Sequence, residues 1–219
     1  MTPDFQKAAI KAAEILVNSD VYKMPISAFH ILKTLKNVQI VPFAEIATNL
    51  NMDRDDLLDT FGSESRAAIT SMEMVKGKKH WLVAYSQYMP TILVQRALAR
   101  ELGHIVLDHD VSCPVETRMA EAYCFAHHLT TPRAVIKMLQ ESEYPLTLEM
   151  FDNVTGCNLQ CLERMRKLPG VEVPAELNRK IREKFSTGLK DLFRYQNILQ
   201  SSDKTDIINL GTFMDGYIE

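Results

Sequence analysis

The stretch LARELGHIVLDH, Leu98–His109, decides how this chain of 219 residues is interpreted. Its apolar residues have helical spacing, and the segment R-E-L-G-H differs at one position from the zinc-protease pattern H-E-x-x-H. Two histidines at i and i+4 of a helix share one face and can hold Zn²⁺, while the glutamate after the first can act as general base. Here His104 has the second histidine position and Glu101 the base position, whereas Arg100 stands where the first histidine is expected.

The bulk composition is that of an ordinary globular domain. Hydrophobic residues make up 46% of the chain, charged residues 24%, and the net charge is −3. No overall field therefore favours nucleic acid or an anionic membrane. No apolar run approaches the ~20 residues of a membrane span, and the N-terminal segment lacks the apolar core of a secretory signal. These features predict a cytoplasmic protein with no direct nucleic-acid or membrane partner.

The periodicity of apolar residues predicts helices, then a small sheet, then more helices. Helices are expected at 4–17, 26–35, 44–50, 54–61, 91–107, 114–131, 132–141, 146–153, 158–167 and 174–198, and strands at 38–43, 67–75 and 80–86. The fold class is therefore α+β, dominated by helices, with a small antiparallel sheet. Residues 1–132 would form the core, residues 133–198 a C-terminal helical part packed on it, and residues 199–219 a polar tail.

A second stretch, EAYCFAHHLTTP at 121–132, makes a family resemblance specific. Together with RALARELGHIVLDHD at 96–110, it resembles the ImmA/IrrE-type metallo-endopeptidases. In that family a helix of the form H-E-L-G-H-x-x-L-x-H is followed by a second helix, E-A-x-x-F-A-x-x-L-x-x-P. The resemblance covers about residues 8–185, and the fold it implies is a minimal zincin-like metallopeptidase domain.

The resemblance also implies roles for individual residues and a setting. It makes His104 and Glu121 zinc ligands and Glu101 the catalytic base, with Arg100 as the departure. Members of the family occur in bacteria, phages and mobile elements, where they often cleave or antagonise a helix-turn-helix repressor. A protein partner of that kind, and a part in transcription regulation, are therefore expected from the resemblance alone.

Arg100 argues against a simple zinc site. Arginine stays protonated and has no lone pair for a metal. A guanidinium ~4 Å from Zn²⁺ would repel the ion by ~8 kcal/mol at an effective dielectric near 20. We therefore expect zinc to be absent or weakly held and proteolysis to be lost or weakened. Arg100 would then be the cation that replaces the metal, its planar fork lying between Glu121 and Glu101.

An active zinc endopeptidase is the alternative, with Glu101 as base and a recruited histidine beside His104 and Glu121. His109 is one candidate, if the helix end unwinds, although as a cation it would also suit a helix C-terminus. His128 is the other, because it follows Glu121 by seven residues and shares its helix face. The sequence leaves the choice between the two readings open.

Two further patterns have structural explanations. The four cysteines do not suggest a disulfide framework, and the Cys157 and Cys161 pair, one helical turn apart, is explained by structural thiols. The segment 146–167 has the appearance of a helix-turn-helix. Its basic residues are confined to its end, so a packing role is favoured over DNA binding.

Overall fold

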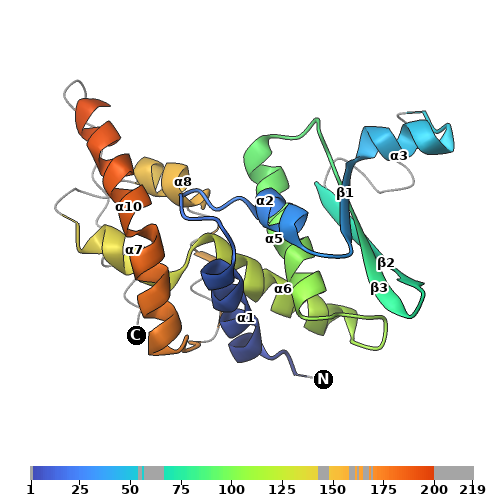
Figure 1. Cartoon of the computed structure of the whole chain (residues 1–219), viewed down its shortest axis with the longest axis horizontal. Helices are drawn as coiled ribbons and strands as arrows, with labels where there is room; N and C mark the ends of the chain where they lie inside the picture. Colours follow the sequence, from blue (N-terminus) through green and yellow to red (C-terminus); the bar gives the residue numbers. More distant parts are fainter. Residues whose placement is uncertain are drawn as a thin grey trace. The chain divides into compact units, whose positions relative to one another are not determined.

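The computed structural model describes residues 2–53, 56, 67–142, 148–157, 161, 163–164, 168 and 170–199. This part of the chain forms two compact units (Figure 1). The first unit is Ser27–Ala126, and the second combines Thr2–Ile26 with the described residues from His127 onward. The helices predicted at 54–61 and 158–167 and the predicted tail lie outside the described residues, apart from isolated positions.

The first unit contains a three-stranded mixed sheet among its described residues, in the order β1-β3-β2. Its strands are β1 (Val38–Pro42), β2 (Ala68–Val75) and β3 (Lys78–Tyr85). The predicted hairpin is confirmed: β2 and β3 are antiparallel and joined at Lys76 and Gly77, whose φ angles are 51° and 75°. Positive φ at both central residues gives the turn whose twist matches the flanking strands.

The prediction of an antiparallel sheet is wrong for β1. This strand pairs with β3 in parallel, with Val38 opposite Trp81 and Val41 opposite Ala84. Parallel pairing requires a long connection that returns the chain to the same end of the sheet. The connection from β1 to β3 includes α3 (Phe43–Leu50) and β2, so its length permits the parallel arrangement.

Helices pack against the sheet and against one another within this unit (Figure 1). The helix α5 (Thr91–Val106) packs against α2 (Ala28–Thr34) and lies against β2 and β3. Its inward stripe is buried and consists of Val94, Ala97, Leu98, Ala99, Leu102 and Gly103. Near α3, a small core cluster is formed by Val41, Phe43 and Ala84. The sheet thus packs beside the helix that carries R-E-L-G-H.

The helices α5 and α6 (Val115–Thr130) approach each other closely at Gly103. A Cβ atom built on Gly103 would lie 3.0 Å from Cδ1 of Phe125 and 3.2 Å from both Cα and O of Ala122. Phe125 and Ala122 are fully buried. Because His104 and Glu121 are the chain neighbours of Gly103 and Ala122, this approach brings them to one side of the helix pair.

The second unit is helical in its described part. Its complete helices are α1 (Phe5–Asn18), α7 (Arg133–Gln140), α8 (Leu148–Thr155) and α10 (Ala175–Leu199). Both α1 and α7 pack against α10. The N-terminal helix therefore belongs with the C-terminal helices, and the boundary between the units falls within α6, after Ala126.

The C-terminal end of α1 is tied to α10 by a partly buried contact. The Lys184 ammonium donates to the carbonyl of Leu16 at 2.6 Å and to that of Ser19. Burial lowers the pKa of Lys184, but the carbonyls at a helix C-terminus favour a cation. On the next turn of α10, a Cβ on Gly188 would lie 2.7 Å from the carbonyl oxygen of Tyr22. The chain after α1 thus lies directly on the backbone of α10.

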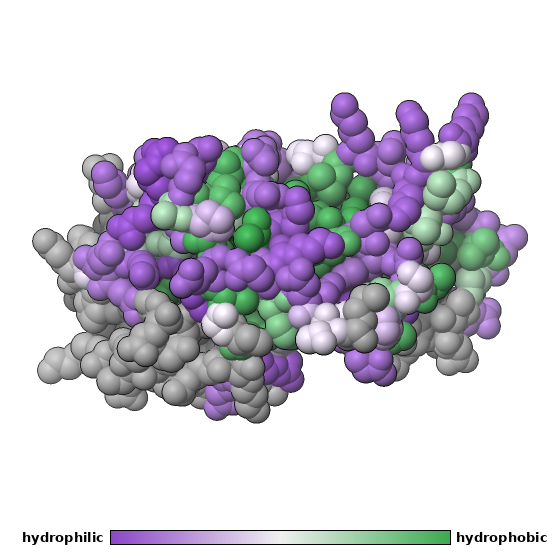
Figure 2. Space-filling view, turned by 90° about the horizontal axis from the view of Figure 1, so that it is seen from below, coloured by the Kyte–Doolittle hydropathy of each residue, from purple (hydrophilic) through white to green (hydrophobic). Residues whose placement is uncertain are grey.

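The surface and the cysteines agree with the bulk composition. The face shown in Figure 2 is largely hydrophilic, with smaller hydrophobic areas among the polar side chains. Within the described residues, no helix has the length and apolar character needed to cross a membrane. The cysteines are free thiols, and Cys124 and Cys157 are buried.

Replacing Gly103 with alanine is expected to lower the free energy of unfolding by about 1–3 kcal/mol, the usual range for overpacking. The helix propensity of alanine acts in the opposite direction by about 1 kcal/mol, so the sign of the change tests the close approach. Urea unfolding followed by circular dichroism measures it. Gly170→Ala is the control, because a Cβ there meets no atom within 4 Å. A Gly103→Ala protein more stable than the unmodified one by about 1 kcal/mol, the gain expected from helix propensity alone, would contradict the packing described.

Candidate functional site

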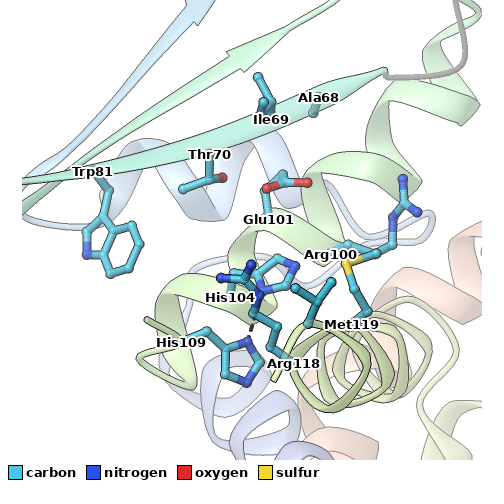
Figure 3. Close-up of a pocket in the computed structure, with 11 residues that line it drawn as sticks. Ala68, Ile69, Thr70, Trp81, Arg100, Glu101, His104, His109, Arg118 and Met119 are labelled. Carbon is cyan, nitrogen blue, oxygen red and sulfur yellow. Dashed lines mark hydrogen bonds between the residues drawn. The ribbon is translucent and has the colours of Figure 1, made fainter. Parts of the chain in front are cut away.

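A cavity of about 440 Å³ lies beside the C-terminal half of α5 in the first unit (Figure 3). Its walls come from β2 and β3 on one side, from α5, and from α6 with the loop before it. Its charged or titratable lining residues are Arg100, Glu101, His104, His109 and Arg118. The R-E-L-G-H segment therefore faces a hollow large enough for part of a ligand.

His109 enters the site because of the way α5 ends. After the last helical residue, Val106, Asp108 adopts a left-handed conformation with φ of 57°. The Asp108 N–H donates to the carbonyl of Ile105 at 3.2 Å, and the His109 N–H donates to that of His104 at 3.0 Å. These two bonds form a Schellman motif, which folds the second residue beyond the helix back over its last turn. His109 thus reaches His104 without any unwinding of the helix end.

Three of the residues singled out in the sequence form one hydrogen-bonded chain. The Nδ1 atoms of His104 and His109 are 2.9 Å apart, and Nε2 of His109 lies 2.8 Å from Oε2 of Glu121. The side chains of His109 and Glu121 are only 6% and 12% exposed. A carboxylate only accepts, so Nε2–H of His109 is the donor to Glu121. The two Nδ1 atoms then share one further proton, carried by either ring.

The environment holds His104 neutral. Burial is the main cause that lowers its pKa from 6.5 to about 4, and electrostatic interactions with His109, Arg118 and Arg100 lower it further. Desolvation disfavours the charged form of an imidazole, and nearby cations act in the same direction. At neutral pH, His104 is therefore a neutral ring at the cavity wall.

The donor atoms suit zinc in kind but not in arrangement. Two imidazoles and a carboxylate are ligands that catalytic zinc sites use. A metal ion needs one lone pair from each of them directed at a single point. Here His109 lies between the other two residues. One of its ring nitrogens bonds to His104 and the other bonds to Glu121. Among the described residues, no group of three His, Cys, Asp or Glu side chains is arranged to hold an ion. As arranged, the three residues do not fit a zinc ion.

Arg100 is not in the place that its predicted role requires. The expected fork between Glu121 and Glu101 is absent, since the carboxylate of Glu121 bonds to His109 instead. Figure 3 shows the Arg100 side chain turned away from Glu101 and His104. Within the part of the chain that the structure describes, its guanidinium has no hydrogen-bond or ion-pair partner. Glu101 does line the cavity, so the predicted base position faces the open space.

His128, the other candidate ligand, lies in a different setting. It belongs to the second unit and is buried. Burial is the main cause that lowers its pKa to about 3, and the charges of Arg133 and His127 add to the effect. It is not among the residues that line the cavity beside α5.

Sequence reasoning missed two contributions to the site. Arg118 lines the cavity, and its Nη1 atom lies 3.4 Å from the carbonyl oxygen of Asp110, a weak contact. It precedes Glu121 by three residues on a predicted helix, so the helical period could have placed it on the same face. The second contribution is the ion pair of Lys79 with Asp108, which ties the hairpin to the loop after α5. No local sequence pattern indicates this contact.

The His104 ring is expected to titrate near pH 4 in the folded protein and near pH 6.5 in the urea-unfolded chain. As pH falls through this window, the unfolded chain takes up a proton that the folded chain does not. Stability is therefore full above pH 6.5 and falls below it, by up to about 1.4 kcal/mol per pH unit. Carbon-13 NMR of the labelled ring measures the midpoint. Arg118→Gln should raise the midpoint of His104 modestly, since burial is the larger cause of its low pKa. A midpoint near pH 6.5 in the folded protein would contradict the buried, neutral state described for His104.

Comparison of the chain with protein-family models, with curated proteins and with solved structures gave no match. Its function is therefore inferred from the residues of this site and from the resemblance carried by the two helical stretches.

Proposed function

We propose that this chain is a metallopeptidase-like protein of the ImmA/IrrE kind in which zinc-dependent proteolysis is lost or weakened. It acts in the cytoplasm by binding a protein partner. A helix-turn-helix repressor is the partner that the resemblance implies. The observation that carries the proposal is the hydrogen-bonded chain of His104, His109 and Glu121, which engages one ring nitrogen of His104, both ring nitrogens of His109 and one carboxylate oxygen of Glu121.

Two physical facts support a site that works without metal. The first ligand position is occupied by Arg100, which has no lone pair to offer. The remaining imidazole of the motif, His104, bonds to His109, and the carboxylate that would complete the site bonds to the other nitrogen of the same ring. Nδ1 of His104, Oε2 of Glu121 and both ring nitrogens of His109 thus each have a protein partner, and a metal ion bound through any of these atoms would have to displace a hydrogen bond.

The walls of the cavity support binding of an extended protein segment. The strand β2 lies at an edge of the described sheet and lines the cavity with Ala68, Ile69 and Thr70. An edge strand offers backbone donors and acceptors to an added strand, while neighbouring pockets receive its side chains. On the opposite wall, the apolar residues Val115 and Met119 are 54% and 45% exposed. The cavity therefore offers both backbone pairing and apolar contacts.

Zinc content is the measurement that tests this proposal. The protein purified without chelator or added zinc is expected to contain well under one zinc per chain by elemental analysis. Arg100→His should raise the content toward one per chain, because it restores the i and i+4 pair with His104. The gain in zinc affinity is expected to be at least about 10–100-fold, the effect of a ligand-shell partner.

Arg100→Gln is the matched variant for this experiment. It removes the positive charge without adding a ligand, so it separates relief of repulsion from restored coordination. It should remain nearly zinc-free. Near-stoichiometric zinc in the unmodified protein would overturn the proposal, and a search for a cleaved partner would then be warranted.

An active zinc endopeptidase is the second candidate, and one observation favours it. His109, predicted as a recruited ligand, lies within hydrogen-bond distance of both His104 and Glu121, and Glu101 lines the same cavity. Binding of zinc by these residues would require the His109 ring to leave its present bonds and present one nitrogen to the ion. His128 is not among the residues that line this cavity.

Zinc titration of three variants separates these roles. If zinc added in excess is held through His109, His109→Gln should weaken its binding about 10-fold or more. His128→Gln and Glu101→Gln should leave it unchanged, because neither residue would be a ligand. A loss of zinc binding in His128→Gln, with His109→Gln unaffected, would instead assign the third ligand to His128.

A further inference from the structure

The Arg100 guanidinium is a cation that lacks a counter-charge in the described structure. It is partly buried, lines the cavity and has no hydrogen-bond or ion-pair partner among the described residues. A guanidinium carries five N–H donors in a planar fork and remains charged at any ordinary pH. Removing such a charge from water is unfavourable unless an acceptor is supplied. The position is thus suited to an acceptor that arrives with a ligand.

The other charges of the cavity do not provide that acceptor. Among the lining residues that the structure describes, Glu101 is the one carboxylate, and Figure 3 shows Arg100 turned away from it. Glu121 is engaged by His109. Arg118 adds a second cation to the same lining, and both arginines contribute to keeping His104 neutral. The lining therefore has an excess of positive charge and can accept one further anion.

The surroundings indicate what accompanies this anion. Val115 and Met119 are one turn apart on α6, and both are exposed on the cavity wall. Ile69 and Trp81 line the cavity from β2 and β3. A ligand that carries only an anion would leave these apolar surfaces in water. A chain that places an apolar side chain next to the anion would cover them.

We infer that Arg100 is a recognition residue for a carboxylate, and that the cavity binds a protein segment in which an acidic group stands beside apolar residues. The inference rests on the proposed protein-binding function and adds the chemistry of the partner. The planar fork of Arg100 matches a carboxylate in a bidentate pair. The residue that removes the first metal ligand thereby supplies a contact for the partner.

A carboxylate fits these charges better than a phosphate or nucleic acid does. Glu101 lies in the same lining and repels a divalent anion about twice as strongly as a monovalent one. A nucleic acid would bring a row of phosphates to a protein of net charge −3. The acidic group is either a Glu or Asp side chain or the carboxylate at a chain end, and the experiment distinguishes these two sources.

Three synthetic peptides provide the probes. One is acetyl-Ala-Leu-Glu-Leu-Ala-amide, the second has glutamine in place of glutamate, and the third is the glutamine peptide with a free C-terminal carboxylate. Their dissociation constants are measured by NMR titration of the full-length protein, with the arginine Nε–Hε signals as reporters. One acidic peptide is expected to bind about 10-fold or more tightly than the neutral peptide, the usual effect of a charge-assisted bond. Which of the two binds identifies the source of the carboxylate.

Variants at Arg100 connect the preference to this residue. Arg100→Gln should reduce the ratio of acidic to neutral affinity to about one, and Arg100→Lys should leave an intermediate ratio, because it keeps the charge but not the planar fork. Lys36→Gln makes the same change of charge at an exposed residue outside the cavity lining, and should leave the ratio unchanged.

Three results would overturn the inference. They are equal binding of acidic and neutral peptides, a preference that persists in Arg100→Gln, and no binding of either acidic peptide at millimolar concentration. Inorganic phosphate that binds more tightly than both acidic peptides, with the same dependence on Arg100, would also overturn it in favour of a phosphate site. The zinc content of the unmodified protein is measured independently. A low zinc content with no acidic preference would remove this inference and leave the proposed metal-free function in place.

Discussion

The site depends on the absence of a side chain at Gly103. With no Cβ there, the backbone of α6 at Ala122 and the ring of Phe125 pack directly against α5. A helix pair separated by even one methyl group more would move His104 and Glu121 apart, because each is the chain neighbour of a residue at the contact. A hydrogen bond of 2.8 Å between His109 and Glu121 tolerates little displacement. The hydrogen bonds that join His104, His109 and Glu121 at the cavity wall therefore depend on the apolar packing between α5 and α6.

Local sequence patterns predicted the helices well, but they did not predict which strands pair over a long distance in the sequence. The helices expected at 91–107 and 114–131 are α5 and α6 within one residue at each end, because proline positions and apolar periodicity mark such boundaries locally. The parallel partner of β1 was not predictable, since alternation in a strand does not identify its neighbour. The place of His109 depends on Asp108 adopting the left-handed conformation that usually marks a glycine. Because an aspartate rather than a glycine has this position, the sequence did not show how α5 ends.

The electrostatic character of the cavity depends on its two arginines, Arg100 and Arg118. A histidine in place of Arg100 would have been a neutral donor facing a second neutral donor, an environment that welcomes a cation. Arg100 and Arg118 instead line the cavity with His104 and help to lower its pKa, and the proposed ligand of this space is accordingly an anion. A change of one residue can thus reverse the sign of the preferred ligand while the packing of the helices is retained. The fold of a site and its chemistry are in this sense separable.

The contact of Lys184 with the end of α1 has a consequence for how the chain is made. Its ammonium bonds to carbonyls 165 and 168 residues earlier in the sequence, and α1 packs on α10. A ribosome adds about 5–20 residues per second, so on the order of ten seconds or more pass between the synthesis of α1 and that of α10. During that time its buried stripe of Ala8, Ala9, Ala12, Ala13 and Leu16 faces water or a chaperone. The nascent chain thus completes its second unit only when α10 has left the exit tunnel.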